Sequence, residues 1–194
     1  MTGRVWTIRP EGPADEAGVR EVEELAFGRP VEARLAEALR RACPACLSLV
    51  AVGDTGRNVG HIVFSPVTLE PDGSAGGGGQ TSSAAGGDAV ASGACGMGLG
   101  PLAVLPERQR QGIGSALVER GLEELRAAGC PCVFLVGHPG YYPRFGFVRA
   151  SGLGLRSQWD AVPDEAWLAL VFDPAALPAA GGLVRFRSEF AAAG

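Results

Sequence analysis

Apolar residues recur at helical spacing in three stretches of the chain. The first begins near Pro13, where Val19, Val22 and Leu25 share one face and acidic residues fall between them. The second covers residues 31–41. The third is a long amphipathic stretch over 110–128, which Gly129 closes as a C-cap. We therefore predict three helices at these places.

Strand-like patterns occupy most of the remaining sequence. They fall at residues 5–9, 47–53, 59–69, 98–105, 132–137, 166–172 and 183–190. A short helix or turn over 138–147 should lead into one more strand. The resulting order of strands and helices predicts an α/β (α+β) domain with both antiparallel and parallel strand pairs.

Residues 72–94 interrupt this pattern with a run rich in Gly, Ser, Ala and Thr. Such a composition buries too little apolar surface to offset the entropy of ordering it, so we expect a flexible insertion. Strand-like sequence resumes directly afterwards, which argues against a domain boundary.

The charge pattern narrows the classes of function. A net charge of −4 argues against a nucleic-acid partner. All 17 basic residues are arginine, so neither a Schiff base nor a lysine nucleophile is available. Apolar runs are too short for a membrane span, and the N-terminal stretch lacks a secretory pattern. We expect a cytoplasmic protein without a membrane partner, and a homodimer remains open.

The five cysteines do not suggest a disulfide framework in a chain of this length. Cys43 and Cys46 have redox spacing, but they follow a helical stretch and not the strand that a thioredoxin-like motif needs. A structural zinc site needs four ligands, and the only histidines are His61 and His138. We therefore expect no metal site.

The stretch around residues 101–125 carries the clearest chemistry. A strand ends at Leu105, a loop follows over 108–112, and a helix begins directly after two closely spaced glycines. Unpaired amides at a helix start point outward and attract anions, which suits a phosphate. The alternative is a plain strand–loop–helix connection with glycines for packing. The loop is neither a Walker loop nor the dinucleotide fingerprint.

Two motifs give this region a family resemblance. Gln109-Arg110-Gln111-Gly112-Ile113-Gly114 resembles the cofactor signature of the GNAT superfamily of acetyl-coenzyme A-dependent N-acetyltransferases. Tyr142-Pro-Arg-Phe-Gly-Phe147 resembles the Tyr-x-x-x-Gly-Phe element after the fifth strand of that family. The resemblance covers residues 4–173, with 174–194 as a C-terminal extension holding a possible extra strand. It implies a mixed, mostly antiparallel sheet flanked by helices, with splayed fourth and fifth strands.

The resemblance also implies a cosubstrate, acetyl-coenzyme A, and residues that bind it. Its pantetheine arm would bond to the backbone of Leu102, Ala103 and Val104, like an added strand. Its pyrophosphate would lie on the amides of Gln109, Arg110, Gln111, Gly112, Ile113, Gly114 and Ser115. The acceptor amine attacks directly in this family, and Tyr142 would protonate the leaving thiolate as general acid. Core packing beside Phe145 and Phe147 is the alternative role for Tyr142.

Many members of that family use a glutamate on the fourth strand as general base. The fourth strand predicted here contains no acidic residue, so the resemblance assigns no general base. The candidates are Glu24, Glu32, His61 and His138, of which His138 lies closest in sequence to Tyr142. The resulting expectation is an N-acetyltransferase acting on a primary amine of a small molecule. The alternative is a non-catalytic acetyl-coenzyme A-binding sensor or docking module. The absence of an acidic residue on the fourth strand favours this alternative slightly, whereas the presence of Tyr142 favours catalysis.

Overall fold

The computed structural model describes residues 6–72 and 95–192. The predicted insertion at 72–94 lies almost wholly outside these residues. The chain divides into two compact units. The first holds the residues up to Ser65, Leu99–Glu124 and those from Ser188, and the second holds Pro66–Gly98 and Leu125–Arg187.

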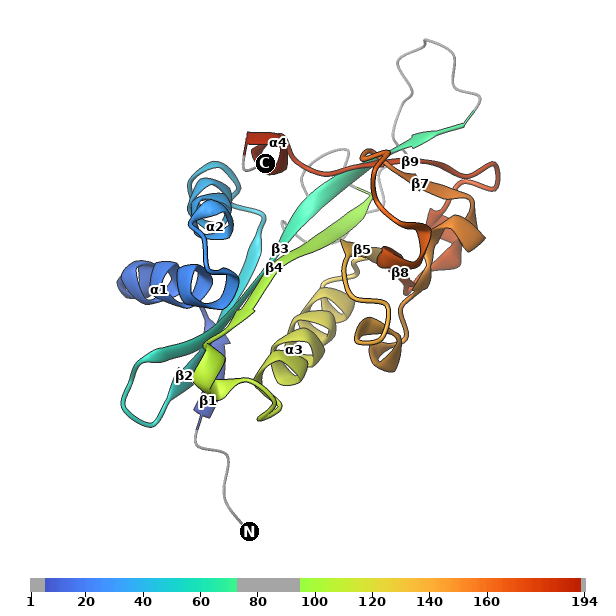
Figure 1. The fold of residues 1–194 in the computed structure, drawn as a ribbon. Coiled ribbons are helices and arrows are strands. Elements are labelled where there is room, and N and C mark those ends of the chain that lie inside the picture. The colour runs from blue at the N-terminus through green and yellow to red at the C-terminus, as the bar shows by residue number, and fades with distance from the viewer. Residues whose placement is uncertain (1–5, 73–94, 193–194) are drawn as a thin grey trace. The chain divides into compact units, whose positions relative to one another are not determined.

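The elements follow one another in the predicted mixed order (Figure 1). The strands are β1 (Trp6–Pro10), β2 (Leu47–Gly53), β3 (Asn58–Pro71), β4 (Gly96–Val104), β5 (Cys132–Val136), β6 (Val148–Arg149), β7 (Leu155–Ser157), β8 (Trp167–Val171) and β9 (Gly182–Arg185). The α-helices are α1 (Glu16–Phe27), α2 (Val31–Ala42), α3 (Ile113–Ala127) and α4 (Glu189–Ala192). Short 3₁₀ turns occupy Pro13–Asp15, Pro106–Arg108, Tyr142–Phe145, Ala150–Leu153, Asp164–Ala166 and Pro174–Ala176.

The sheet is mixed and mostly antiparallel, as predicted. β1, β2, β3 and β4 follow one another in the sheet, and β2 pairs antiparallel with both β1 and β3. β4 and β5 pair in parallel, with Met97 opposite Val133 and Gly98 opposite Phe134. β5 and β6 both pair antiparallel with β8. Within the described residues, no helix has the length and apolarity that a bilayer span requires.

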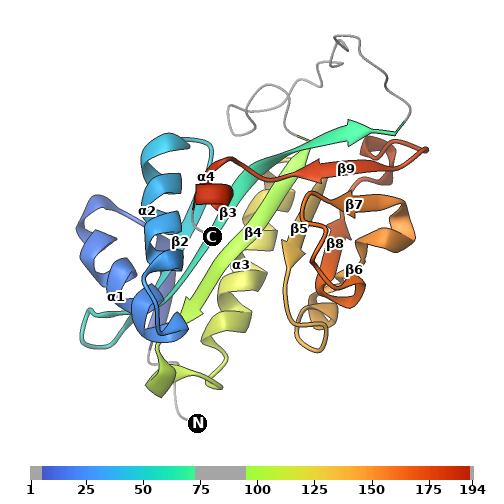
Figure 2. The same cartoon turned by 45° about the horizontal axis from the view of Figure 1, so that its top comes forward.

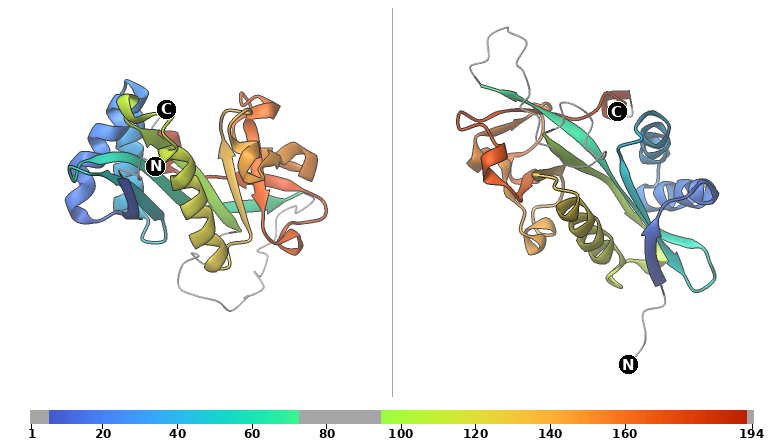
Figure 3. Two further views of the ribbon diagram at one scale, coloured as in Figure 1. Left: turned by 90° about the horizontal axis from the view of Figure 1, so that it is seen from below. Right: turned by 180° about the vertical axis from the view of Figure 1, so that it is seen from behind.

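In the first unit, β3 separates two layers of helices because its side chains alternate between its faces. Val63 packs against Leu35 and Leu39 of α2. Gly60 points the other way, and a Cβ built on it would lie 2.9 Å from Ile113 of α3. Figure 3 shows α1 and α2 on one side of these strands and α3 on the other.

In the second unit, aromatic side chains pack between short strands. Figure 2 shows these strands, β5, β7 and β8, beside one another. Phe134 of β5 stacks on Trp167 of β8, with ring centroids 5.8 Å apart. The indole N–H of Trp167 donates to the Leu155 carbonyl oxygen at 3.0 Å, which ties β8 to β7. Phe186 lies over Gly98, where a Cβ would approach its ring to 2.3 Å. Glycine is therefore required at that point of β4.

Two predicted boundaries are corrected by the structure. The helix predicted from residue 110 begins at Ile113, because Arg110 (φ 60°) and Gly112 (φ 84°) have left-handed backbone conformations that no right-handed helix contains. The strand predicted over 183–190 ends at Arg185, and α4 replaces its last residues. The short strand β7 was not predicted, because three residues are too few for a periodic signal.

Candidate functional site

The loop between β4 and α3 is built to expose backbone amides. After Leu105, the turn Pro106–Arg108 is closed by a hydrogen bond from the Arg108 amide to the Leu105 carbonyl oxygen at 2.8 Å. The loop then passes through Arg110 and Gly112 before the first helical hydrogen bond, from Ala116 N to Gly112 O at 3.0 Å. Amides at the start of a helix have no acceptor one turn earlier, so those of this first turn are available to an anion.

Glycine at position 112 leaves open space in front of these amides. A Cβ built there meets no atom within 4 Å, and the φ of 84° strains any other residue. Arg110 adopts φ 60° without being glycine, and its side chain is exposed. A left-handed arginine is uncommon and marks a backbone that its surroundings hold in place. Both features fit a loop that receives a phosphate group.

The loop glutamines brace the loop itself. The side-chain amide of Gln109 donates through Nε2 to the Val104 carbonyl oxygen at 3.2 Å. Gln111 donates through Nε2 to the backbone carbonyl oxygen of Glu107, also at 3.2 Å. Sequence analysis assigned both residues to cofactor binding through their amides. The side-chain contacts show a further role, which is to hold the turn between β4 and α3.

The second motif places Tyr142 in an aromatic cluster of the second unit. Its side chain is 9% exposed, and its ring lies edge-on to Phe147 at 5.7 Å and to Tyr141 at 5.0 Å. Gly137 makes room for this ring, because a Cβ there would come within 2.4 Å of it. Burial raises the pKa of Tyr142 well above its ordinary value, so the phenol stays protonated at neutral pH. It can donate a proton but does not act as a base.

The candidate bases are placed very differently. His138 is exposed, and its Nδ1 accepts a hydrogen bond from the Gly140 amide at 3.1 Å, which shapes the turn before Tyr142. Glu24 is exposed on α1, and Glu32 is paired with Arg29. His61 is completely buried and surrounded by polar groups that sequence analysis did not single out.

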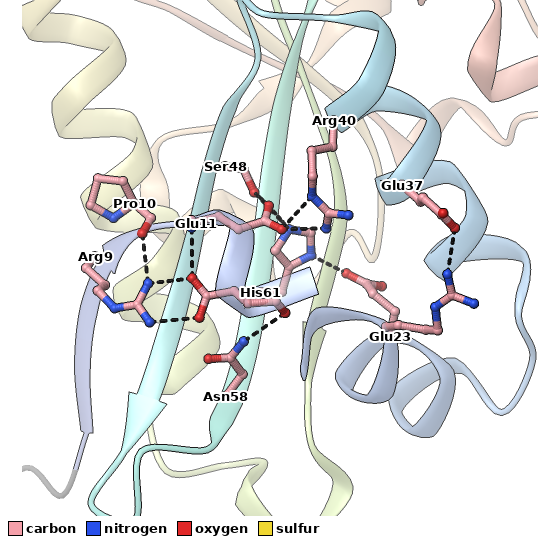
Figure 4. Close-up of polar contacts among 12 residues, drawn as sticks. Arg9, Pro10, Glu11, Glu23, Glu37, Arg40, Ser48, Asn58 and His61 are labelled. Carbon is pink, nitrogen blue, oxygen red and sulfur yellow. Dashed lines mark hydrogen bonds and ion pairs between the residues drawn. The ribbon is translucent and has the colours of Figure 1, made fainter. Parts of the chain in front are cut away.

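His61 is the centre of a buried polar network in the first unit (Figure 4). Its Nδ1 lies 2.5 Å from Oε1 of Glu23, and its Nε2 lies 2.9 Å from the Ser48 hydroxyl oxygen. The Ser48 hydroxyl lies 2.5 Å from Oε2 of Glu11. Arg40 donates from Nε to Oε1 of Glu11 at 2.7 Å. The network joins α1, α2, β2, β3 and the segment after β1.

The contacts of Glu11 determine which atoms of this network carry the hydrogens. Burial alone would raise the pKa of Glu11, but its contacts with His61, Ser48 and Arg40 outweigh burial and lower it to about 2. Glu11 is therefore ionised, and the hydrogen between it and Ser48 belongs to Ser48. Since a serine hydroxyl has one hydrogen, the one between Ser48 and His61 belongs to Nε2 of His61.

One further hydrogen lies between His61 and Glu23. Burial raises the pKa of Glu23, whose Oε2 has no hydrogen-bond partner among the described residues. Burial alone would lower the pKa of His61, but its hydrogen bonds to Glu11 and Glu23 outweigh burial and raise it. The His61–Glu23 pair therefore holds one proton more than the two isolated side chains would hold at neutral pH.

The positions of these hydrogens exclude a hydrolase-like role for Ser48. Ser48, His61 and Glu23 stand in the order of nucleophile, base and orienting acid in a hydrolase triad. However, the Ser48 hydrogen is directed to Glu11, and Nε2 of His61 carries a hydrogen of its own. His61 therefore has no free lone pair toward Ser48 and does not activate it.

The cysteines at the end of α2 form a turn. The Cys46 amide donates to the Cys43 carbonyl oxygen at 3.1 Å, and neither Cys43 nor Cys46 forms a disulfide bond. No group of three His, Cys, Asp or Glu side chains suited to a metal ion occurs within residues 6–72 and 95–192.

Comparison with known proteins decides the family. Residues 17–147 match the model of the Acetyltransferase (GNAT) family, and this span includes the β4–α3 loop and the Tyr142 element. The chain belongs to this family. It is accordingly an acyltransferase, and its mixed sheet with a parallel β4–β5 pair is that of the GNAT fold.

Individual relatives support the assignment over most of the chain. YjhQ of Escherichia coli K12, an uncharacterized N-acetyltransferase, is 38% identical over 78% of this chain and 75% of its own length. YhbS of the same organism is 31% identical over 94% of this chain and 97% of its own length.

Two solved GNAT structures extend the likeness to three dimensions. The YhbS structure from Escherichia coli, in complex with CoA, matches with a TM-score of 0.79 and 30% identity, covering 96% of this chain and 92% of that one. A GNAT acetyltransferase from Brucella melitensis, in complex with acetyl-CoA, matches with a TM-score of 0.70 and 34% identity, covering 95% and 97%.

Proposed function

We propose that this GNAT protein transfers the acetyl group of acetyl-CoA to a primary amine of a small-molecule acceptor by direct attack. The observation that carries the proposal is the loop before α3, where the exposed Gln111 and Gly112 lead into the helix start and leave open space that suits a pyrophosphate. Two GNAT relatives of known structure are complexes with CoA and acetyl-CoA, which supports the choice of cosubstrate.

Separate parts of the chain would bind the pyrophosphate and the pantetheine arm of acetyl-CoA. The backbone amides of the loop and of the first turn of α3, from Gln109 to Ser115, would hold the pyrophosphate, and the exposed guanidinium of Arg110 would add a cation. The backbone of Leu102, Ala103 and Val104 would bond to the pantetheine arm as an added strand does. Acetyl-CoA supplies an activated thioester, so no enzyme nucleophile is required.

Proton transfer is the remaining task. Tyr142 is protonated at neutral pH, as an ordinary tyrosine is, so it is in the form that a general acid needs to protonate a departing thiolate. His138 is the candidate base because it is exposed and lies near Tyr142 in sequence; its basic nitrogen is Nδ1, which would release the Gly140 amide in order to accept a proton. His61 is less suited to that role, because both of its ring nitrogens are engaged within the buried network.

Calorimetry with a matched pair of variants tests the cofactor loop. Gly112 and Gly129 lie at opposite ends of α3, have φ of 84° and 76°, and each faces open space. Valine therefore imposes similar backbone strain at either position. We expect Gly112→Val to weaken acetyl-CoA binding by about tenfold or more, a loss of about 1.4 kcal/mol, and Gly129→Val to leave it nearly unchanged. Equal losses would refute the loop assignment.

Turnover is tested separately with a panel of primary amines and a free-thiol readout. Release of thiol that depends on both amine and acetyl-CoA supports the transferase. Tight acetyl-CoA binding without release by any amine in the panel would favour a sensor or docking module.

A further inference from the structure

A pocket of about 460 Å³ opens beside the buried network of the first unit. Its charged lining consists of Glu11, Glu16 and Arg40, and Ser48 adds a hydroxyl. The remaining wall is largely apolar and includes Leu47 and Val63. A volume of this size falls within the range of pockets that hold small organic molecules.

The charges around the pocket favour a cation. The lining contains two carboxylates, those of Glu11 and Glu16, and one guanidinium, that of Arg40. Behind the wall, the His61–Glu23 pair is neutral overall when it holds its extra proton and negative when it does not. The surroundings therefore carry excess negative charge in either state, which attracts a cation and disfavours an anion.

Glu11 is the group best placed to receive that cation. Its side chain is only 6% exposed, and the 23%-exposed Arg40 holds it in an ion pair. The Ser48 hydroxyl occupies Oε2 of Glu11. The same hydroxyl also lies 2.9 Å from Nε2 of His61, so rotation about its C–O bond would direct its hydrogen to His61 instead. That rotation requires Nε2 to lose its own hydrogen first.

We propose that this pocket binds a primary ammonium ion attached to a hydrocarbon chain, and that binding releases one proton from the His61–Glu23 pair. The ammonium donates to Oε2 of Glu11, the Ser48 hydroxyl turns to the vacated Nε2 of His61, and the proton passes to the solvent. The hydrocarbon chain lies against Leu47 and Val63. Incoming charge and departing proton balance, so the net charge of the buried region is unchanged.

Every element around His61 contributes to this coupling. Glu23 faces it from α1, Ser48 from β2, and Glu11 from the segment after β1, while Arg40 of α2 neutralises Glu11. Glu32 of α2 acts on Glu23 through its charge and is itself paired with Arg29. Binding of the ammonium ion requires no acetyl-CoA, so this proposal can be tested independently of the proposed transfer reaction.

The test is calorimetry of the full chain with hexylammonium and its neutral counterpart 1-hexanol, without acetyl-CoA. Titrations at neutral pH are repeated in phosphate and in MOPS, whose ionisation enthalpies differ and neither of which contains a primary amine. We expect hexylammonium to bind about tenfold tighter than hexanol, a difference of about 1.4 kcal/mol. Its binding enthalpy should differ between the buffers by the amount expected for one released proton.

Three variants separate the parts of the proposal. Glu11→Gln should weaken hexylammonium binding by about tenfold, or about 1.4 kcal/mol. Glu37→Gln, which removes a carboxylate of α2 outside the pocket lining, should not weaken it. Ser48→Ala keeps the Glu11 charge, so it should still bind the amine but release no proton. Equal binding of hexanol, equal enthalpies in both buffers, or equal behaviour of the two glutamate variants would overturn the proposal. Circular dichroism confirms that each variant is folded.

Discussion

Nδ1 of His61 lies 2.5 Å from Oε1 of Glu23, and both side chains are withdrawn from solvent. Because Oε2 of Glu23 has no other partner among the described residues, each member of the pair depends on the other. Removing one partner of a buried ion pair costs about 3–5 kcal/mol, since it leaves the other charge uncompensated.

A double-mutant cycle tests this dependence. We expect Glu23→Leu and His61→Leu each to lower the free energy of unfolding in urea by about 3 kcal/mol or more. The double variant should lose clearly less than the sum, because it leaves no unpaired charge behind. Additive losses would show that the two side chains are stabilised independently.

The stability of the fold should fall at alkaline pH because of His61. Its pKa is raised in the folded state, so the folded protein holds the proton more tightly than the unfolded chain does. The resulting stability is fully present below the unfolded pKa of about 6.5 and is lost as pH rises through the folded value. Urea unfolding from pH 6 upward measures the slope, which is at most about 1.4 kcal/mol per pH unit for one proton. The double variant with Glu23→Leu and His61→Leu should flatten it, because neither titrating group of the pair remains.

Glu11 should produce the opposite dependence in acid. Its pKa is lowered from 4.5 to about 2, so its contribution is present above pH 4.5 and is lost as pH falls toward 2. Glu11→Gln should therefore flatten the part of the acid unfolding curve between these two values. If this variant kept the same acid dependence as the wild-type protein, other carboxylates such as Asp15, whose pKa is also lowered to about 2, would account for the curve.

Gly121 of α3 should not tolerate alanine, although helix propensity alone would favour it by about 1 kcal/mol. A Cβ at this position would approach Cε2 of Phe64 to 2.2 Å, so the buried ring must move. Overpacking of this kind costs about 1–3 kcal/mol, which exceeds the gain in propensity. Gly121→Ala should lower the melting temperature, and adding Phe64→Leu should restore part of the loss. A stabilised single variant would contradict the packing described for β3 and α3.

Tyr142→Phe should separate catalysis from packing. The substitution keeps the ring against Phe147 and Gly137 and removes the hydroxyl alone. A general acid contributes about 10²–10⁴ in rate, so turnover should fall by that order while acetyl-CoA affinity stays the same. Tyr141→Phe is the matched control and should have a much smaller effect. Equal small effects in both variants would assign Tyr142 to the aromatic core alone.

Sequence reasoning located the elements that apolar periodicity defines, and it failed where the backbone departs from periodicity. β2 and α2 were predicted to within one residue, because their apolar faces repeat regularly. The helix expected from near Pro13 begins at Glu16, since a 3₁₀ turn occupies Pro13–Asp15. The start of α3 was misplaced because the left-handed conformation of Arg110 has no signature in residue type. The strand–loop–helix connection itself was predicted correctly, since two closely spaced glycines separate a strand pattern from a helical one.

The buried network was only partly visible in the sequence. His61 was a candidate base, but Glu23, which lies beside it, was not among the candidates. A signal existed, because Glu23 follows Val19 by one helical turn and so lies on the buried face of α1. Glu11, Arg40 and Ser48 gave no such signal. Their contacts join residues 29 and 37 positions apart, and only the folded sheet brings these together.

The placement of α4 bears on the order in which the protein folds as it is synthesised. Phe190 packs against Leu35, Leu39 and Val63, so residues near the end of the chain complete a core that begins in α2. A nascent chain can form α2 and β3 early, but this apolar surface stays uncovered until Phe190 has left the ribosome. The core between α2 and β3 is therefore completed by a residue that is translated long after its first members.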